Sequence, residues 1–184
     1  MITVSVVGAW APIASAATIE VTVERRGEIV DIRANASIQS DPATAWRVLT
    51  AYDRYAEFIP DLRTSRVIAR SGATVTVEQS GDAQFGLLRI PLDITFEIVE
   101  FPPSGLRSRA TSGILRALES SHRLTPMAQG VRLDYVGSVP SGVGFLGLPE
   151  IQAFKQNVAR QFQALADEIE SESAGGVAHG VGAF

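Results

Sequence analysis

The most regular hydrophobic pattern of the chain lies near its C-terminal end. Apolar residues recur there at gaps of three and four, which is the spacing of one face of a helix. This apolar stripe consists of Ile151, Phe154, Val158, Phe162, Leu165 and Ile169. Pro149 suits a first helical turn, where its missing N–H has no partner, so we predict a helix over Leu148–Glu170. Such a helix is about 33 Å long and needs a large apolar surface to cover its stripe.

The chain before this helix alternates between apolar and polar positions, as strands with one buried face do. The clearest alternating segment carries Ile90, Leu92, Ile94, Phe96 and Ile98. Further strands are predicted within Thr18–Ile38, as two strands or one bent strand, and from Leu62 onward, ending with Ala117–Thr125 and Val131–Val139. Short connections between successive strands predict an antiparallel meander.

The alternation stops once, between the first and the later strands. Asp41 is a typical helix cap, Pro42 suits the first turn, and the apolar spacing that follows predicts a short helix. A second short helical turn is predicted over Tyr52–Phe58, and it ends before Pro60.

The passages Asp41–Leu49, Tyr52–Tyr55 and Phe58–Pro60 resemble the polyketide cyclase/dehydrase and coenzyme Q-binding protein group of the START-like (SRPBCC) superfamily. Ala56 departs from that resemblance, because the group usually has proline there. The resemblance implies an α+β helix-grip fold over residues 17–171. In that fold a curved antiparallel sheet wraps around one long C-terminal helix, with two short helices after the first strands and a cavity for an apolar ligand.

Composition narrows the function. The 184 residues suit one domain, and the net charge of −4 with scattered basic residues argues against nucleic-acid binding. Cysteine is absent and only His122 and His179 are present, so we expect neither a metal site nor a cofactor.

Both ends of the chain differ from its middle. Residues 1–16 carry no charge and end in small residues, which predicts an export signal and a periplasmic protein, although the basic segment of such a signal is missing. A loosely held N-terminal segment and a cytoplasmic location are the alternative. Residues 172–184 are rich in glycine and are predicted to be a disordered tail.

Polar residues interrupt the inward face of two predicted strands. Ser120 and His122 alternate in phase with leucines, and Tyr135 shares a face with apolar residues. Ser108 and Gln79 are pocket candidates by the same alternation. The predicted ligand-binding residues are Ser120, His122, Tyr135, Phe96, Phe154, Val158, Phe162 and Phe145. His122 and Tyr135 are also candidates for proton transfer, but one histidine without a carboxylate partner favours an ordinary core histidine and a buried tyrosine.

These observations favour a binding protein over an enzyme. We expect a carrier of a hydrophobic small molecule, such as a lipid, an isoprenoid or quinone, or a polycyclic compound. The first alternative is a cyclase/dehydrase-type enzyme acting on a polyketide-like substrate. The second is an interaction protein at a membrane face that makes transient contact through the glycine-rich apolar segment 143–148. The sequence predicts no oligomeric state.

Overall fold

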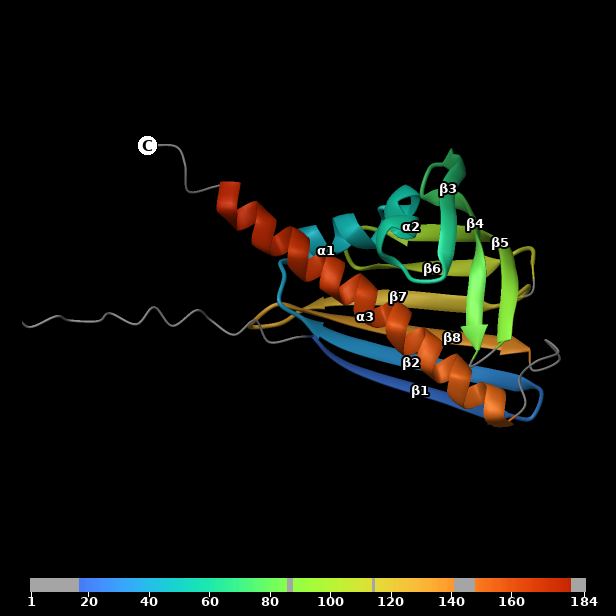
Figure 1. Cartoon of the computed structure of the whole chain (residues 1–184). Helices are drawn as coiled ribbons and strands as arrows, with labels where there is room; N and C mark the ends of the chain where they lie inside the picture. Colours follow the sequence, from blue (N-terminus) through green and yellow to red (C-terminus); the bar gives the residue numbers. More distant parts are fainter. Residues whose placement is uncertain (1–16, 86–87, 114, 141–147, 180–184) are drawn as a thin grey trace, which may run out of the picture.

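One antiparallel sheet of eight strands dominates the computed structural model, which describes residues 17–85, 88–113, 115–140 and 148–179 (Figure 1). The strands are β1 (Thr18–Arg26), β2 (Ile29–Ile38), β3 (Leu62–Ser71), β4 (Thr74–Phe85), β5 (Leu88–Phe101), β6 (Gly105–Ala110), β7 (Glu119–Pro126) and β8 (Val131–Pro140). Their order across the sheet is β1-β2-β8-β7-β6-β5-β4-β3. The meander from β3 to β8 therefore joins the first hairpin where β2 pairs with β8. This is the predicted α+β helix-grip architecture.

The sequence left open whether Thr18–Ile38 forms two strands or one bent strand, and the structure contains two strands. β1 and β2 are separate strands, and Gly27 in the turn between them has a φ of +62°, which side-chain-bearing residues rarely adopt. The strand predicted over Ala117–Thr125 begins later, at Glu119. Ala117 has a φ of +72° and belongs to the preceding turn, because an extended strand requires negative φ.

Three short elements connect β2 to β3: α1 (Pro42–Leu49), the 3₁₀ helix η1 (Tyr52–Arg54) and α2 (Tyr55–Phe58). The predicted cap of α1 is confirmed, since the Asp41 carboxylate accepts hydrogen bonds from the backbone N–H of Ala43 and Thr44, both at 2.9 Å. The second predicted helical turn is divided between η1 and α2 because the chain tightens at its start.

The long helix α3 (Leu148–His179) crosses the concave face of the sheet (Figure 1). It continues past Glu170, so the prediction of disorder is wrong for residues 172–179. Contacts with the first third of the chain hold this extension: Glu172 accepts hydrogen bonds from Arg47 and Arg54, and the Ser173 hydroxyl lies 2.6 Å from that of Ser40. Residues 1–16, 141–147 and 180–184 lie outside the described residues, as does the predicted export signal.

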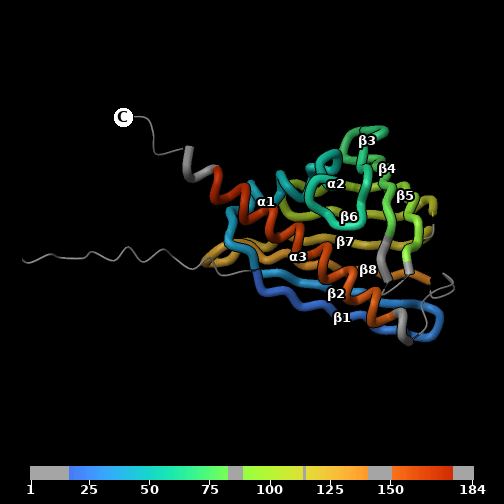
Figure 2. Tube along the Cα trace, viewed as in Figure 1, coloured from blue at the N-terminus to red at the C-terminus, as the bar shows by residue number. Residues whose placement is uncertain are grey.

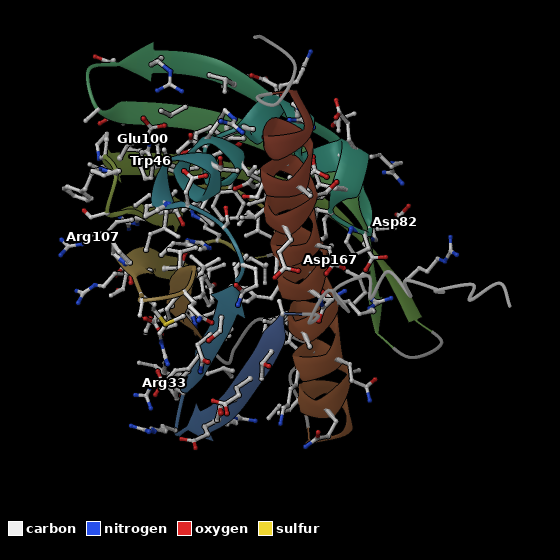
Figure 3. The ribbon with its side chains drawn as sticks, turned by 90° about the vertical axis from the view of Figure 1, so that its left-hand side faces the viewer. Arg33, Trp46, Asp82, Glu100, Arg107 and Asp167 are labelled. Atoms are coloured by element: carbon white, nitrogen blue, oxygen red, sulfur yellow. The ribbon has the colours of Figure 1, made fainter. Side chains whose placement is uncertain are left out.

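Two groups of buried apolar residues pack between α3 and the sheet. The larger group surrounds the second half of α3, where Leu165, Ala166 and Ile169 contact the elements around α1. Figure 2 shows α1 beside this half of the helix. The smaller group surrounds the first half, where Phe154 packs near residues of β2, β5 and β8. The outward surfaces are polar: Arg33 and Arg107 on the sheet and Asp167 on α3 point away from the body (Figure 3).

Candidate functional site

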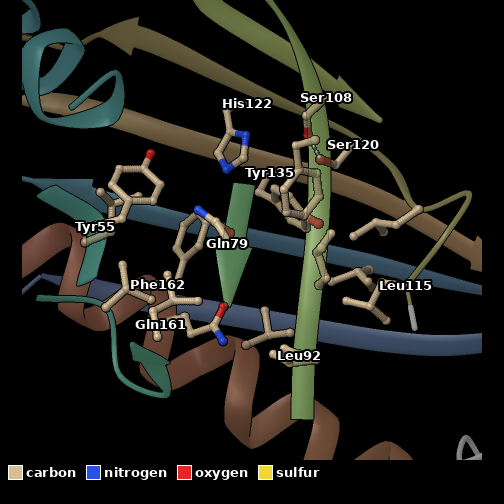
Figure 4. Close-up of a pocket in the computed structure, with 18 of the residues that line it drawn as sticks. Tyr55, Gln79, Leu92, Ser108, Leu115, Ser120, His122, Tyr135, Gln161 and Phe162 are labelled. Carbon is tan, nitrogen blue, oxygen red and sulfur yellow. Dashed lines mark hydrogen bonds between the residues drawn. The ribbon is translucent and has the colours of Figure 1, made fainter. Parts of the chain in front are cut away.

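A cavity of about 230 Å³ lies between α3 and the concave face of the sheet (Figure 4). Most of its wall is apolar. The sheet contributes Ile32, Leu92, Ile94, Phe96, Ile98, Leu106 and Leu118. The helix contributes Phe154, Val158, Phe162 and Leu165, which belong to the apolar stripe predicted from the sequence. The apolar stripe of α3 therefore faces the apolar side of the sheet, as predicted, but a cavity separates the two surfaces over part of their length.

Polar side chains enter the wall from neighbouring strands. Strand pairing places Ser108 of β6 opposite Ser120 of β7, and His122 of β7 opposite Tyr135 of β8. Since side chains two residues apart share a face, all four project into the cavity together. Gly137 leaves room for this arrangement, because a Cβ atom there would lie 2.6 Å from the Tyr135 hydroxyl oxygen.

The two serines are hydrogen-bonded to each other, and the tyrosine interacts with one of them. The hydroxyl oxygens of Ser108 and Ser120 are 2.6 Å apart, so one donates a hydrogen bond to the other. Burial raises the pKa of Tyr135 to about 12, and hydrogen bonding with Ser120 offsets part of that rise. Tyr135 is thus a neutral hydroxyl at physiological pH. Its ring also makes an edge contact with Phe162 of α3, at 6.1 Å between centroids.

His122 differs from these neighbours because its Nδ1 atom is buried without a hydrogen-bond partner. Its ring centroid lies 4.8 Å from that of Tyr135, with the two planes tilted by 59°. Burial lowers the pKa of His122 to about 4, so the imidazole is neutral at pH 7. Buried polar atoms in proteins are generally hydrogen-bonded, and this one is an exception within the described structure.

A polar link joins α3 to the start of β3 at the cavity wall. The Asn157 side chain donates a hydrogen bond to the Asp61 carboxylate at 2.7 Å, and Arg160 forms an ion pair with the same oxygen at 3.0 Å. Gln161 donates to Asn157 at 2.9 Å. The Asp61 carbonyl can approach β4 closely because Gly81 has no side chain there: a Cβ atom would lie 2.0 Å from it. Asn157 and Gln161 therefore face the cavity while tying the helix to the sheet.

The cavity wall includes most of the residues predicted from the sequence. They are Ser120, His122, Tyr135, Phe96, Phe154, Val158 and Phe162, together with the additional candidates Ser108 and Gln79. Phe145 and nearly all of segment 143–148 lie outside the described residues. The role of these residues in ligand binding stays a prediction.

Sequence reasoning missed four polar or aromatic residues of the wall: Tyr52, Tyr55, Asn157 and Gln161. The two tyrosines were indistinguishable from core residues by spacing. Their hydroxyls are satisfied by Glu100 at 3.1 Å and by the Leu49 carbonyl at 2.6 Å. The two amides carried a usable signal, since they lie three and seven positions after Phe154 and so share the apolar face of the helix.

The chemistry of the wall is that of a neutral cavity. None of the described lining residues is charged. Within the same described ranges, no three His, Cys, Asp or Glu side chains come together as metal ligands. The helices of the described structure include none with the length and apolar character needed to cross a membrane.

The chain is similar to known proteins in its sequence family and in its fold. Residues 38–166 match the model of the family described as polyketide cyclase/dehydrase and lipid transport. No curated protein matches the chain.

Several solved structures are similar in fold. The protein TTHA0849 of Thermus thermophilus has a TM-score of 0.65 at 17% identity, with 78% of this chain and 99% of that one covered. The Zhui aromatase/cyclase of Streptomyces sp. R1128 has a TM-score of 0.62 at 14% identity, covering 83% and 98%. A STAR-related lipid transfer protein fragment of Xanthomonas axonopodis has a TM-score of 0.61 at 13% identity, covering 84% and 99%.

Proposed function

Because the chain belongs to the polyketide cyclase/dehydrase and lipid transport family, we propose that it binds and carries a hydrophobic small molecule between α3 and the sheet. The observation that carries this proposal is the cavity itself, which has a mostly apolar wall and no charged residue among the described lining. Ligand sites are typically concave, mainly apolar, and oriented by a few polar groups. The polar set around His122 matches that description.

The expected affinity follows from the buried area. Removing about 300 Å² of ligand apolar surface from water gives a gross driving force of about 7 kcal/mol. Losses of translational and rotational freedom offset much of that gain. Micromolar binding is therefore expected without any special chemistry.

A cyclase/dehydrase-type enzyme is the second candidate, because His122 and Tyr135 lie side by side on the wall. The pKa values of these two side chains favour the carrier function over the enzyme. A general acid or base works best with a pKa near the operating pH, whereas these two pKa values lie at about 4 and about 12. Turnover of a poly-β-keto substrate that is lost in His122→Phe would establish the enzyme instead.

Native mass spectrometry of the full chain tests the carrier proposal. The protein is incubated with a total lipid extract, separated from unbound material and sprayed under non-denaturing conditions. We expect one small molecule per chain for the wild type and none for Val158→Phe, whose larger side chain enters the cavity. The control is Gln156→Phe, which adds the same ring to the exposed face of α3. Equal retention by wild type and Val158→Phe would overturn the proposal.

A further inference from the structure

The hydrogen bonds of the wall leave one polar group unmatched. Ser108, Ser120 and Tyr135 interact with one another, as described above. The imidazole of His122 remains, because no hydrogen bond joins it to the described residues. Its Nδ1 atom is enclosed by protein, so Nε2 is the ring nitrogen left for a ligand in the cavity. Figure 4 shows this ring pointing into the cavity on the side of Gln79. The ring is therefore prepared for a hydrogen bond that the protein does not supply.

The absence of charge on the described wall restricts which ligand group can form a hydrogen bond with His122. His122 is neutral at pH 7 because burial lowers its pKa to about 4, and the described lining contains no Lys or Arg. A carboxylate placed there would be a buried charge without a counter-ion, which is strongly unfavourable. A hydroxyl both donates and accepts, so it suits either tautomer of a neutral imidazole.

The size of the cavity restricts the rest of the molecule. A dry apolar cavity of about 150 Å³ in another protein holds one benzene ring. The present cavity of about 230 Å³ is roughly half as large again, which corresponds to about two fused rings. Phe154, Val158 and Phe162 of α3 supply the apolar side facing the sheet.

We propose that the ligand is a neutral, hydroxyl-bearing apolar molecule of about two fused rings, and that its hydroxyl is hydrogen-bonded to His122. This inference rests on the proposed carrier function and assigns its ligand class. It separates the chain from a fatty-acid carrier, because a fatty acid is an anion at neutral pH. It also makes His122 a specificity residue rather than a proton shuttle.

Three probes of one size test the inference: 2-naphthol, naphthalene and 2-naphthoate, titrated at pH 7 into the full chain by calorimetry. In a purely apolar cavity, naphthalene would bind more tightly than 2-naphthol, because the hydroxyl would lose its bonds to water. We expect the opposite for the wild type, with 2-naphthol binding about fivefold to tenfold more tightly than naphthalene. We expect 2-naphthoate to bind more weakly than both.

Two variants locate the effect. His122→Leu is expected to reverse the order, so that naphthalene binds more tightly than 2-naphthol. Val158→Ala removes an apolar contact and is expected to weaken both probes by the same factor, which leaves their ratio unchanged. Naphthalene binding at least as tightly as 2-naphthol in the wild type would overturn this inference while leaving the carrier function intact. Absence of saturable binding for all three probes would also overturn this inference, and the carrier function is then decided by the native mass spectrometry with a total lipid extract.

Discussion

Beyond Leu165 the helix α3 packs against a filled core, whereas from Phe154 to Leu165 it borders a cavity. Ala166 and Ile169 have no exposed surface and contact the residues around α1. Phe154 and Val158, on the same stripe, face open space across which the sheet presents serines, a histidine and a tyrosine. The stripe has one period throughout. Periodicity therefore shows which side of a helix is buried, but it does not distinguish packing against side chains from facing a cavity.

The two halves are also attached differently. The second half is joined to η1 and α1 by charged side chains, with Arg54 contacting both Glu168 and Glu172. The first half is joined to β3 through the buried amide of Asn157 and the carboxylate of Asp61. Stability and ligand binding should consequently depend on different ends of one helix.

We expect the largest difference in stability between two substitutions that shorten aliphatic side chains of α3. Ile169→Ala should lower the free energy of unfolding by about 2–5 kcal/mol, because it leaves a void in a filled core. Val158→Ala should cost less than about 1.5 kcal/mol, because its side chain already borders a cavity. Urea unfolding measures both. Equal losses would contradict the distinction between the two halves.

The next effect is a dependence of stability on pH. The folded-state pKa of His122 is about 4, below the ordinary value of 6.5, so the unfolded chain takes up the proton first. The stabilisation present above pH 6.5 is therefore lost as the pH falls to about 4, by about 3 kcal/mol.

His122→Leu isolates this contribution from the carboxyl groups that titrate in the same range. The difference in unfolding free energy between wild type and variant, measured by urea at pH 7 and pH 4, should shift by about 3 kcal/mol against the wild type at the lower pH. A difference that does not change with pH would show that the imidazole titrates normally and is not buried neutral in the cavity.

The hydrogen bond between Asn157 and Asp61, in the first half of α3, should contribute less to stability than the effects above. Asn157→Ala removes the donor to Asp61 and should cost about 1–2 kcal/mol, because a partly buried carboxylate loses a hydrogen bond. Gln156→Ala, on the exposed face of the same turn, should change stability by less than about 0.5 kcal/mol. Thermal unfolding of the two variants checks this, and similar melting temperatures would mean that the link is not stabilising.

The smallest effect concerns the ion pairs of the second half. Arg54→Ala should cost about 0.5–1 kcal/mol, since the guanidinium is 44% exposed but contacts several carboxylates. Arg66→Ala is the matched control, because its pair with Glu78 is 71% and 50% exposed and should contribute almost nothing. High salt should reduce the difference between the two variants. A loss as large as that of Ile169→Ala would mean that charge, rather than packing, secures this half.

Much of the fold followed from local pattern. Asp41 and Pro42 marked the start of α1, the alternation around Phe96 marked β5, and the stripe marked α3. The C-terminal end of α3 was missed because its stabilising contacts, from Glu172 to Arg47 and Arg54, join residues more than a hundred positions apart. Export of the chain stays a prediction.

The site was predicted less completely, for a physical reason. Alternation identified Ser120, His122 and Tyr135 as inward-facing, because the side chains of a strand have period two. The volume that they surround depends on the curvature of the whole sheet and on its distance from α3. The contribution of Tyr55 likewise depends on tertiary structure, because α2 reaches the wall through its contacts with β3 and α3.

Diffraction from crystals of the chain pressurised with xenon tests directly whether α3 borders a cavity, because xenon enters apolar cavities. We expect an ordered xenon atom between the sheet and the first half of α3, in contact with Phe154 or Val158. We expect no xenon beside Ala166 and Ile169, which have no exposed surface. Absence of xenon from the first site, with side chains filling that space, would show that α3 packs against the sheet without a cavity.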